Sequence, residues 1–199
     1  MNACGIILSG GKSSRMGTNK ALLKINEIPN VERVKQELQL LVSDLILVSN
    51  DPETYQFLKL KTVTDDYPGQ GPLAGIHAGL QASAFELNLV VACDMPFVSS
   101  KLGQRLLELA DQYDAVIPVI NGKQQPLFAV YRKGIFKEIE KCIMTGNLRI
   151  KQLLAGLNCL YVTEQELSAF TEASLDQIFF NMNHPEEYEH AKHWANKGE

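Results

Sequence analysis

Several features that mark whole classes of protein are absent from this sequence of 199 residues. It has no run of about 18 apolar residues, so no membrane-spanning helix is predicted. The N-terminus begins with an apolar core pattern instead of a basic segment and a long apolar run, so no signal peptide is expected. The formal net charge of −4 lacks the basic excess of proteins that bind nucleic-acid polymers. These absences favour a cytoplasmic protein whose partner is neither a membrane nor a nucleic acid.

Cysteine is also scarce, and its spacing excludes a common kind of metal site. The four cysteines are Cys4, Cys93, Cys142 and Cys159, and no two of them form a C-x-x-C pair. The ligand spacing of a structural zinc site is therefore missing. Their settings predict reduced, mostly buried thiols, as in a cytoplasmic protein.

What the sequence does contain is an alternation of apolar runs with stretches of helical periodicity. Buried strands are predicted at residues 4–8, 45–49, 62–64, 87–92 and 115–119. Between two of them, Val31, Val34, Leu38 and Leu41 form one apolar helix face. Such alternation predicts an α/β fold with a mostly parallel sheet covered by helices on both faces. The length suits one domain over residues 1–199.

The pattern changes at Asn121-Gly122, which lies between two apolar runs and predicts a hairpin. The hairpin places residues 127–131 as an antiparallel strand in the sheet. Further elements are then predicted as helices over 135–144 and 148–154, strands over 159–162 and 179–181, and a last helix from Pro185. Asp51-Pro52 and Ser99 or Ser100 are candidate helix starts.

The most informative segment is residues 8–20, L-S-G-G-K-S-S-R-M-G-T-N-K, which follows a predicted strand. Gly10 and Gly11 allow backbone N–H groups to approach phosphate oxygens, and Arg15 and Lys20 supply cations. The alternative is an ordinary glycine-rich turn with two solvated cations. A Walker A loop is excluded because it requires glycine at the position of Ile6.

Two other strand ends carry polar groups. Asp94 directly follows the run 89–93, where a carboxylate is a natural Mg²⁺ ligand beside substrate phosphates; alternatively, it initiates the turn before Pro96. Residues 65–75, D-D-Y-P-G-Q-G-P-L-A-G, predict a rigid irregular loop that ends in a helix near Pro72 or Leu73. This loop either recognises a base and ribose, with Asp65 as acceptor, or is a Pro/Gly loop with solvated aspartates.

A third polar strand end is predicted at residues 181–186, N-M-N-H-P-E. Asn181 and Asn183 either contact a ligand or tie down a turn by Asx hydrogen bonds. No nucleophile–base arrangement is evident, and nucleotidyl transfer from a triphosphate relies on positioning, cations and a magnesium ion instead.

Taken in order, these motifs resemble those of the molybdenum cofactor guanylyltransferases. Leu8-Ser9-Gly10-Gly11 with Arg15-Met16-Gly17 and Lys20 is similar to the signature L-A-G-G-x-x-x-R-M-G-x-x-K. Residues 65–75 resemble D-x-x-P-G-x-G-P-L-A-G, residues 93–96 resemble C-D-x-P, and residues 181–186 resemble N-x-N-x-P-E. The matches extend over nearly the whole chain.

The resemblance implies a Rossmann-like nucleotidyltransferase fold and transfer of GMP from GTP to molybdopterin with release of pyrophosphate. It implies the partners GTP and molybdopterin, with other molybdenum cofactor biosynthesis proteins and acceptor molybdoenzymes beyond them, and Mg²⁺ as cofactor. Arg15, Lys20 and Asp94 are the expected catalytic residues, with Asp94 as metal ligand. The expected nucleotide-binding residues are Leu8, Ser9, Gly10, Gly11, Lys20, Asn50, Asp65, Gly71, Pro72, Leu73 and Asp94, and Asn181 and Asn183 are assigned to the molybdopterin side.

Three alternatives remain open from the sequence. They are a CTP-dependent cytidylyltransferase acting on the same cofactor, a sugar-1-phosphate nucleotidylyltransferase, and a GTP-binding cofactor chaperone without transfer activity. Gly10-Gly11 leaves room beside the base and favours a purine. The sequence departs from the family pattern at Ser9, where alanine is common, at Asn19, where aspartate is usual, and over residues 26–30.

Overall fold

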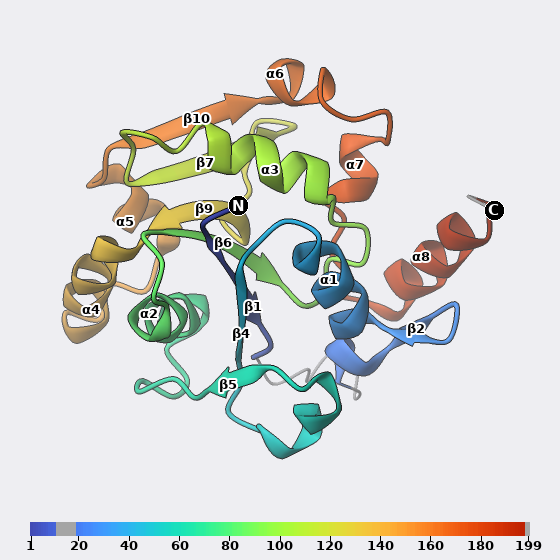
Figure 1. The fold of residues 1–199 in the computed structure, drawn as a ribbon, viewed down its shortest axis with the longest axis horizontal. Helices are drawn as coiled ribbons and strands as arrows, with labels where there is room; N and C mark the ends of the chain where they lie inside the picture. Colours follow the sequence, from blue (N-terminus) through green and yellow to red (C-terminus); the bar gives the residue numbers. More distant parts are fainter. Residues whose placement is uncertain (11–18, 198–199) are drawn as a thin grey trace.

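The computed structural model of the protein describes residues 1–10 and 19–197. Its centre is an eight-stranded sheet in the order β10-β7-β9-β6-β1-β4-β5, with β8 paired to β7 (Figure 1). The strands are β1 (Cys4–Leu8), β4 (Asp44–Val48), β5 (Lys61–Val63), β6 (Leu87–Ala92), β7 (Ala115–Ile120), β8 (Lys123–Gln124), β9 (Phe128–Arg132) and β10 (Cys159–Thr163). A separate two-stranded sheet joins β2 (Lys24–Ile25) to β3 (Ile28–Pro29).

The sheet is mostly parallel, as the sequence predicts, with β9 running against its neighbours. β1 pairs in parallel with β4 and β6, and β7 pairs in parallel with β10, whereas β9 is antiparallel to both β6 and β7. The predicted hairpin is confirmed because Asn121 and Gly122 both adopt positive φ, +51° and +68°, as a type I′ turn requires. This turn first pairs β7 with the two-residue β8, an antiparallel strand that the sequence pattern does not predict.

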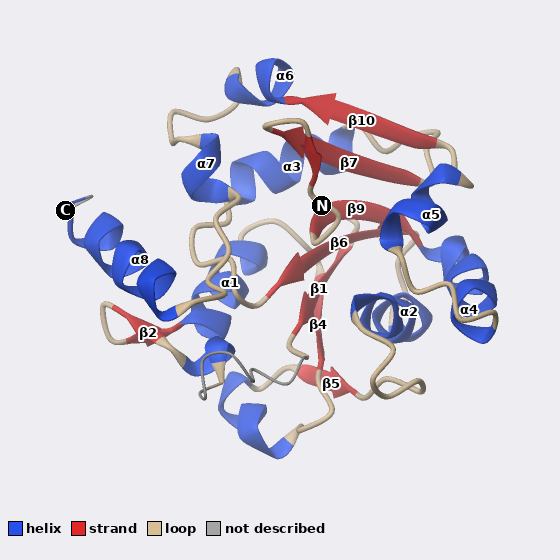
Figure 2. Cartoon of the chain, turned by 180° about the vertical axis from the view of Figure 1, so that it is seen from behind, coloured by secondary structure: helices blue, strands red, loops and turns tan. Residues whose placement is uncertain are grey.

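Helices cover both faces of the sheet (Figure 2). Helices α1 (Asn30–Gln39) and α3 (Ser100–Glu108) share one core with Ile7, while α2 (Pro72–Ala82), α4 (Phe136–Met144) and α5 (Ile150–Ala155) share the other with Ile6. Neighbouring strand residues therefore supply opposite layers, as the strand period of two requires. The remaining elements are η1 (Lys20–Leu22), η2 (Glu53–Leu58), η3 (Lys133–Ile135), α6 (Glu164–Ser168), α7 (Leu175–Ile178) and α8 (Pro185–Lys197). Of the two predicted caps, Ser99 is the N-cap of α3, and its side chain accepts a hydrogen bond from the Leu102 N–H (3.4 Å).

Three expectations need correction. Residues 179–181 form no strand: α7 ends at Ile178, and the Phe179 ring packs on Phe128 with centroids 5.2 Å apart. Asp51 is not a helix N-cap: the N-cap of η2 is Pro52, and the Asp51 carboxylate accepts from the Thr54 hydroxyl (2.5 Å). The four free cysteines are not mostly buried, because only Cys4 is fully buried.

No helix among the described residues is long and apolar enough to span a membrane.

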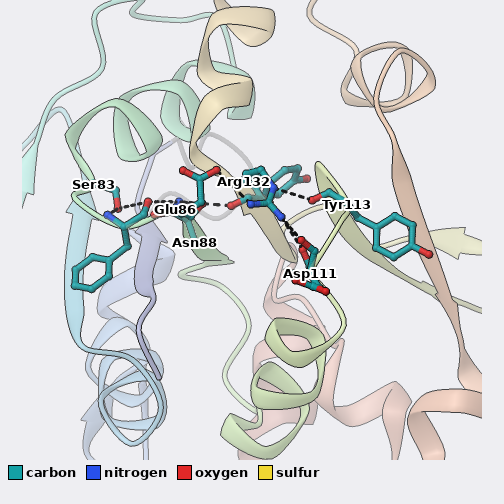
Figure 3. A network of polar contacts seen from close by, with 9 residues as sticks. Ser83, Glu86, Asn88, Asp111, Tyr113 and Arg132 are labelled. Atoms are coloured by element: carbon teal, nitrogen blue, oxygen red, sulfur yellow. Dashed lines mark hydrogen bonds and ion pairs between the residues drawn. The ribbon is translucent and has the colours of Figure 1, made fainter.

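A polar network centred on Arg132, the last residue of β9, connects the chain before β6 with the chain before β7 (Figure 3). In the antiparallel pairing of β9 with β6, Arg132 lies opposite Leu87, the first residue of β6. The Arg132 guanidinium donates to three main-chain carbonyls, those of Ala110 (3.1 Å), Asp111 (2.6 Å) and Tyr113 (3.2 Å). Glu86 approaches it to 3.4 Å. The network ties the chain after α3 to the strands β6 and β9.

Candidate active site

The sheet register brings three of the predicted site segments to one edge. Leu8, the last residue of β1, aligns with Val48 of β4 and Ala92 of β6. The pairing continues one residue further, because the Ser9 N–H donates to the Val48 carbonyl (2.9 Å) and the Cys93 N–H to the Leu8 carbonyl (3.0 Å). Residues just beyond these ends therefore emerge side by side, at the edge where ligands bind in such sheets.

Asp94 and Lys20 form the charged pair at this edge. The Lys20 Nζ lies 3.9 Å from Asp94 Oδ2, and each side chain is 20% exposed. Burial raises the pKa of the Asp94 carboxyl above its usual value, and the Lys20 ammonium partly opposes this rise. The pair places one carboxylate and one ammonium where a triphosphate and its counterion would meet.

No group of three or more His, Cys, Asp and Glu that could hold a metal occurs among the residues that the structure describes. A single protein carboxylate is nevertheless a sufficient anchor for Mg²⁺, which keeps several waters and takes its other ligands from substrate phosphates. The donor set around Asp94 fits that role and no all-protein metal cage.

Lys20 is the first residue of η1, and its ammonium group contacts a residue near the other end of the chain. Its Nζ donates to Asn183 Oδ1 (2.9 Å) across 163 residues of sequence. Asn19 starts this short helix by accepting a hydrogen bond from the Ala21 N–H (3.1 Å). Asn181 makes a different contact, donating to the Phe179 carbonyl (3.2 Å). The two predicted asparagines thus have different partners, and only Asn183 touches Lys20.

Tyr55 joins the two described ends of the glycine-rich segment. Its phenol oxygen accepts hydrogen bonds from Ser9 Oγ (2.6 Å) and Asn19 Nδ2 (2.9 Å), and the residue is 4% exposed. Burial raises the Tyr55 pKa above its usual value, so the phenol stays protonated at neutral pH. Sequence reasoning missed Tyr55, because no local pattern reports a contact across 46 residues. The predicted site residues Gly11 and Arg15 lie outside the described residues.

Gly10 occupies an exposed position at the start of this segment. A Cβ placed there would meet no described atom within 4 Å, and its φ is not positive. Neither packing nor backbone conformation within the described structure therefore demands glycine. An exposed glycine lets a ligand approach the backbone closely.

Asn50 and Asp65 form a second polar pair, between the ends of β4 and β5. Asn50 Nδ2 donates to Asp65 Oδ2 (2.7 Å), and the Asp65 N–H donates to Asn50 Oδ1 (3.1 Å). The other carboxylate oxygen of Asp65 accepts from the Tyr67 N–H (3.1 Å). Asn50 is exposed to solvent, so the polar atoms of this pair are accessible to a ligand.

The helix predicted to start near residue 72 is confirmed as α2. Gly71 is its N-cap with φ +69°, a conformation that favours glycine, and Pro72 takes the first helical position. Gly71 and Pro72 are exposed, whereas Leu73 is fully buried. The Leu73 side chain therefore belongs to the core, and only its backbone remains available to a ligand.

Comparison with known proteins identifies the family of this chain. Residues 5–167 match the MobA-like NTP transferase domain family. A probable molybdenum cofactor guanylyltransferase of Pelotomaculum thermopropionicum is 38% identical over 93% of this chain and 89% of its own, and one of Carboxydothermus hydrogenoformans is 35% identical over 92% and 91%.

Solved structures give the same result for the fold. The molybdopterin-guanine dinucleotide biosynthesis protein A of Archaeoglobus fulgidus superposes with a TM-score of 0.85 at 28% identity, covering 98% of this chain and 99% of its own. A CMP:2-keto-3-deoxy-manno-octonic acid synthetase complexed with CTP has a TM-score of 0.76 at 13% identity, with both chains fully covered, and shares the fold alone. The chain belongs to the MobA-like NTP transferase domain family.

Proposed function

We propose that this protein is a molybdenum cofactor guanylyltransferase, which transfers GMP from GTP to molybdopterin and releases pyrophosphate. The observation that carries the proposal is the convergence of Lys20 and Asp94, 3.9 Å apart, at the strand ends beside the glycine-rich segment. Family membership and the molybdenum cofactor guanylyltransferase relatives support the same activity.

In the proposed reaction an acceptor oxygen of molybdopterin attacks the α-phosphorus of GTP. The bond between the α-phosphorus and the oxygen that bridges it to the β-phosphorus breaks, and the electron pair of this bond leaves with pyrophosphate. Lys20 binds the phosphates and stabilises the charge that accumulates on the leaving group. Backbone groups of residues 8–11 hold the nucleotide, with Arg15 as a further cation from outside the described residues.

Asp94 is the residue that would hold Mg²⁺, and the ion would supply charge neutralisation along the phosphates. The nucleoside is assigned to Asn50, Asp65 and the backbone at residues 71–73. The molybdopterin side is assigned to Asn181.

We also propose a single-domain, cytoplasmic protein. The single domain is supported by the main sheet, which is assembled from strands between residues 4 and 163. The cytoplasmic location is supported by the four free thiols. Other molybdenum cofactor biosynthesis proteins and acceptor molybdoenzymes are its proposed partners.

The test is a reaction of purified protein with GTP, Mg²⁺ and molybdopterin, in which guanine dinucleotide and pyrophosphate are both measured. Both products are expected in equal amounts. Calorimetry with GTP and CTP decides the base, and tighter binding of CTP would contradict the guanylyl assignment. GTP binding without any product under these conditions would favour the chaperone alternative.

A further inference from the structure

The segment 181–184 is fixed by backbone hydrogen bonds on both sides of Asn183. On one side the Met182 N–H donates to the Asp94 carbonyl (3.0 Å), and the Met182 side chain is fully buried against Ile25 and Ala191. The residue before Asn183 is therefore bonded to the main chain of Asp94, whose carboxylate lies beside Lys20.

On the other side the Glu187 carboxylate holds the backbone. Its Oε2 accepts hydrogen bonds from the Asn183 N–H and from the His184 N–H (2.8 Å). The Glu187 N–H in turn donates to the His184 carbonyl (3.1 Å). This reciprocal pair at the start of α8 matches half of a capping box, so Glu187 sets the backbone that aims the Asn183 side chain.

The acceptor that Asn183 offers to Lys20 is an uncharged amide oxygen, 2.9 Å from Nζ. An amide orients an ammonium without neutralising it, whereas a carboxylate in the same place would form an ion pair and compete with phosphate oxygens. Because Lys20 already lies 3.9 Å from Asp94, a second anion would leave the ammonium poorly available to a ligand.

From these contacts we infer that Asn183 and Glu187 are positioning residues for Lys20, acting on the triphosphate and not on molybdopterin. This inference rests on the proposed function for the role of Lys20. It divides the two asparagines of one motif between different tasks, since Asn181 bonds only the Phe179 carbonyl among the contacts of the described residues.

The first test compares Asn183→Asp with Asn181→Asp, which adds the same charge two residues away. GTP binding is measured by calorimetry with Mg²⁺ and without molybdopterin. We expect Asn183→Asp to weaken GTP binding about tenfold and Asn181→Asp to weaken it by about threefold at most. Equal effects, or an Asn183→Asp variant that binds GTP normally and only raises the KM for molybdopterin, would overturn the assignment.

The second test separates positioning from simple capping. Glu187→Ala is expected to weaken GTP binding about threefold, and Glu187→Gln to restore it, because the amide oxygen still accepts the two N–H groups. Glu186→Ala, an exposed neighbour in the same helix turn, is the matched control. A Glu187→Ala protein that melts earlier but binds GTP like wild type would reduce Glu187 to a helix cap and contradict the inference.

These binding measurements remain decisive if the proposed transfer fails. A wild-type protein that binds GTP but forms no guanine dinucleotide would refute the proposed function, while the Asn183 and Asn181 variants still decide the positioning of Lys20. A wild-type protein that binds no GTP would overturn both.

Discussion

The two ends of the central sheet use polar side chains in opposite ways. At the amino end, Arg132 donates to the main-chain carbonyls of Ala110, Asp111 and Tyr113. At the carboxyl end, Lys20 faces the side chains of Asn183 and Asp94. A main-chain carbonyl cannot leave its place without local unfolding, but a side chain can rotate away and be replaced by a ligand. The amino end therefore stabilises the fold, while the carboxyl end is built for exchange.

Glycine follows the same division. In the layers of the fold, a Cβ at Gly79 would meet Ile6 at 2.4 Å, and one at Gly103 would meet Leu89 at 2.8 Å. At the carboxyl end, a Cβ at Gly10, Gly69 or Gly71 would meet no described atom within 4 Å. Packing thus requires glycine in the core, whereas φ values of +81° and +69° favour it at Gly69 and Gly71.

The largest expected effect is on turnover and comes from Asp94→Ala. Removing the proposed Mg²⁺ carboxylate should abolish guanine dinucleotide formation. The Met182 N–H bond to the Asp94 carbonyl does not involve the side chain and survives the change, so the protein should remain folded. Pyrophosphate release and urea unfolding measure the two quantities. Asp111→Ala, which alters an exposed side chain at the amino end, is the control, and wild-type turnover in Asp94→Ala would remove the metal role.

Next is Lys20→Ala, which should lower kcat more than it weakens GTP binding. A charge-assisted hydrogen bond contributes roughly 1.5–3 kcal/mol, so a ten- to hundredfold fall in kcat is expected as charge moves onto the leaving pyrophosphate. Steady-state kinetics compare this variant with Lys24→Ala as the control. The Lys24 side chain is largely exposed, and its Nζ lies 4.0 Å from Glu27 Oε2. If the two variants gave the same kinetics, Lys20 would have no role beyond the surface.

Arg132→Met tests the other end of the sheet. It leaves three carbonyls without their guanidinium donor and should lower the free energy of unfolding by about 2–3 kcal/mol. The kcat/KM of the folded protein should stay at the wild-type value. Urea unfolding and kinetics below the transition separate these quantities. The control is Arg105→Met, which loses an ion pair with Glu108 and the stacking of its guanidinium over the Phe170 ring (4.5 Å) but no main-chain carbonyl contact. A reduced kcat/KM without lost stability would mean that the two ends are not independent.

Most of the fold was predictable because it depends on short-range patterns. Strand periodicity located the central strands, and the positive φ that Asn121-Gly122 tolerates predicted the hairpin. The strand expected over 179–181 was wrong because the short apolar run at residues 178–180 does not distinguish a strand from the end of a helix. Ile178 and Phe179 enter one core, while Phe180 packs on Trp194.

Of the candidate site, the sequence predicted the chain segments but not their cross-connections. Asp94 and Asn50 could be placed at strand ends from pattern alone. The bonds of Tyr55 to Ser9 and of Lys20 to Asn183 span 46 and 163 residues. Such pairings arise only when the sheet register and loop packing are set together, so no local motif reports them.

The smallest expected effect is that of Tyr55→Phe, which tests how much the Tyr55 hydroxyl stabilises the carboxyl end of the sheet. Ser9 and Asn19 both lose an acceptor, which should cost about 1 kcal/mol of unfolding free energy and weaken GTP binding about threefold. Because burial raises the Tyr55 pKa, the wild-type phenol stays protonated across the neutral range and the difference should not vary with pH there. The double variant Ser9→Ala/Tyr55→Phe removes both partners of the shorter bond, so its loss in GTP binding should be less than the sum of the two single losses. Strict additivity would mean that the two hydroxyls act separately, and that Tyr55 does not join the ends of the glycine-rich segment.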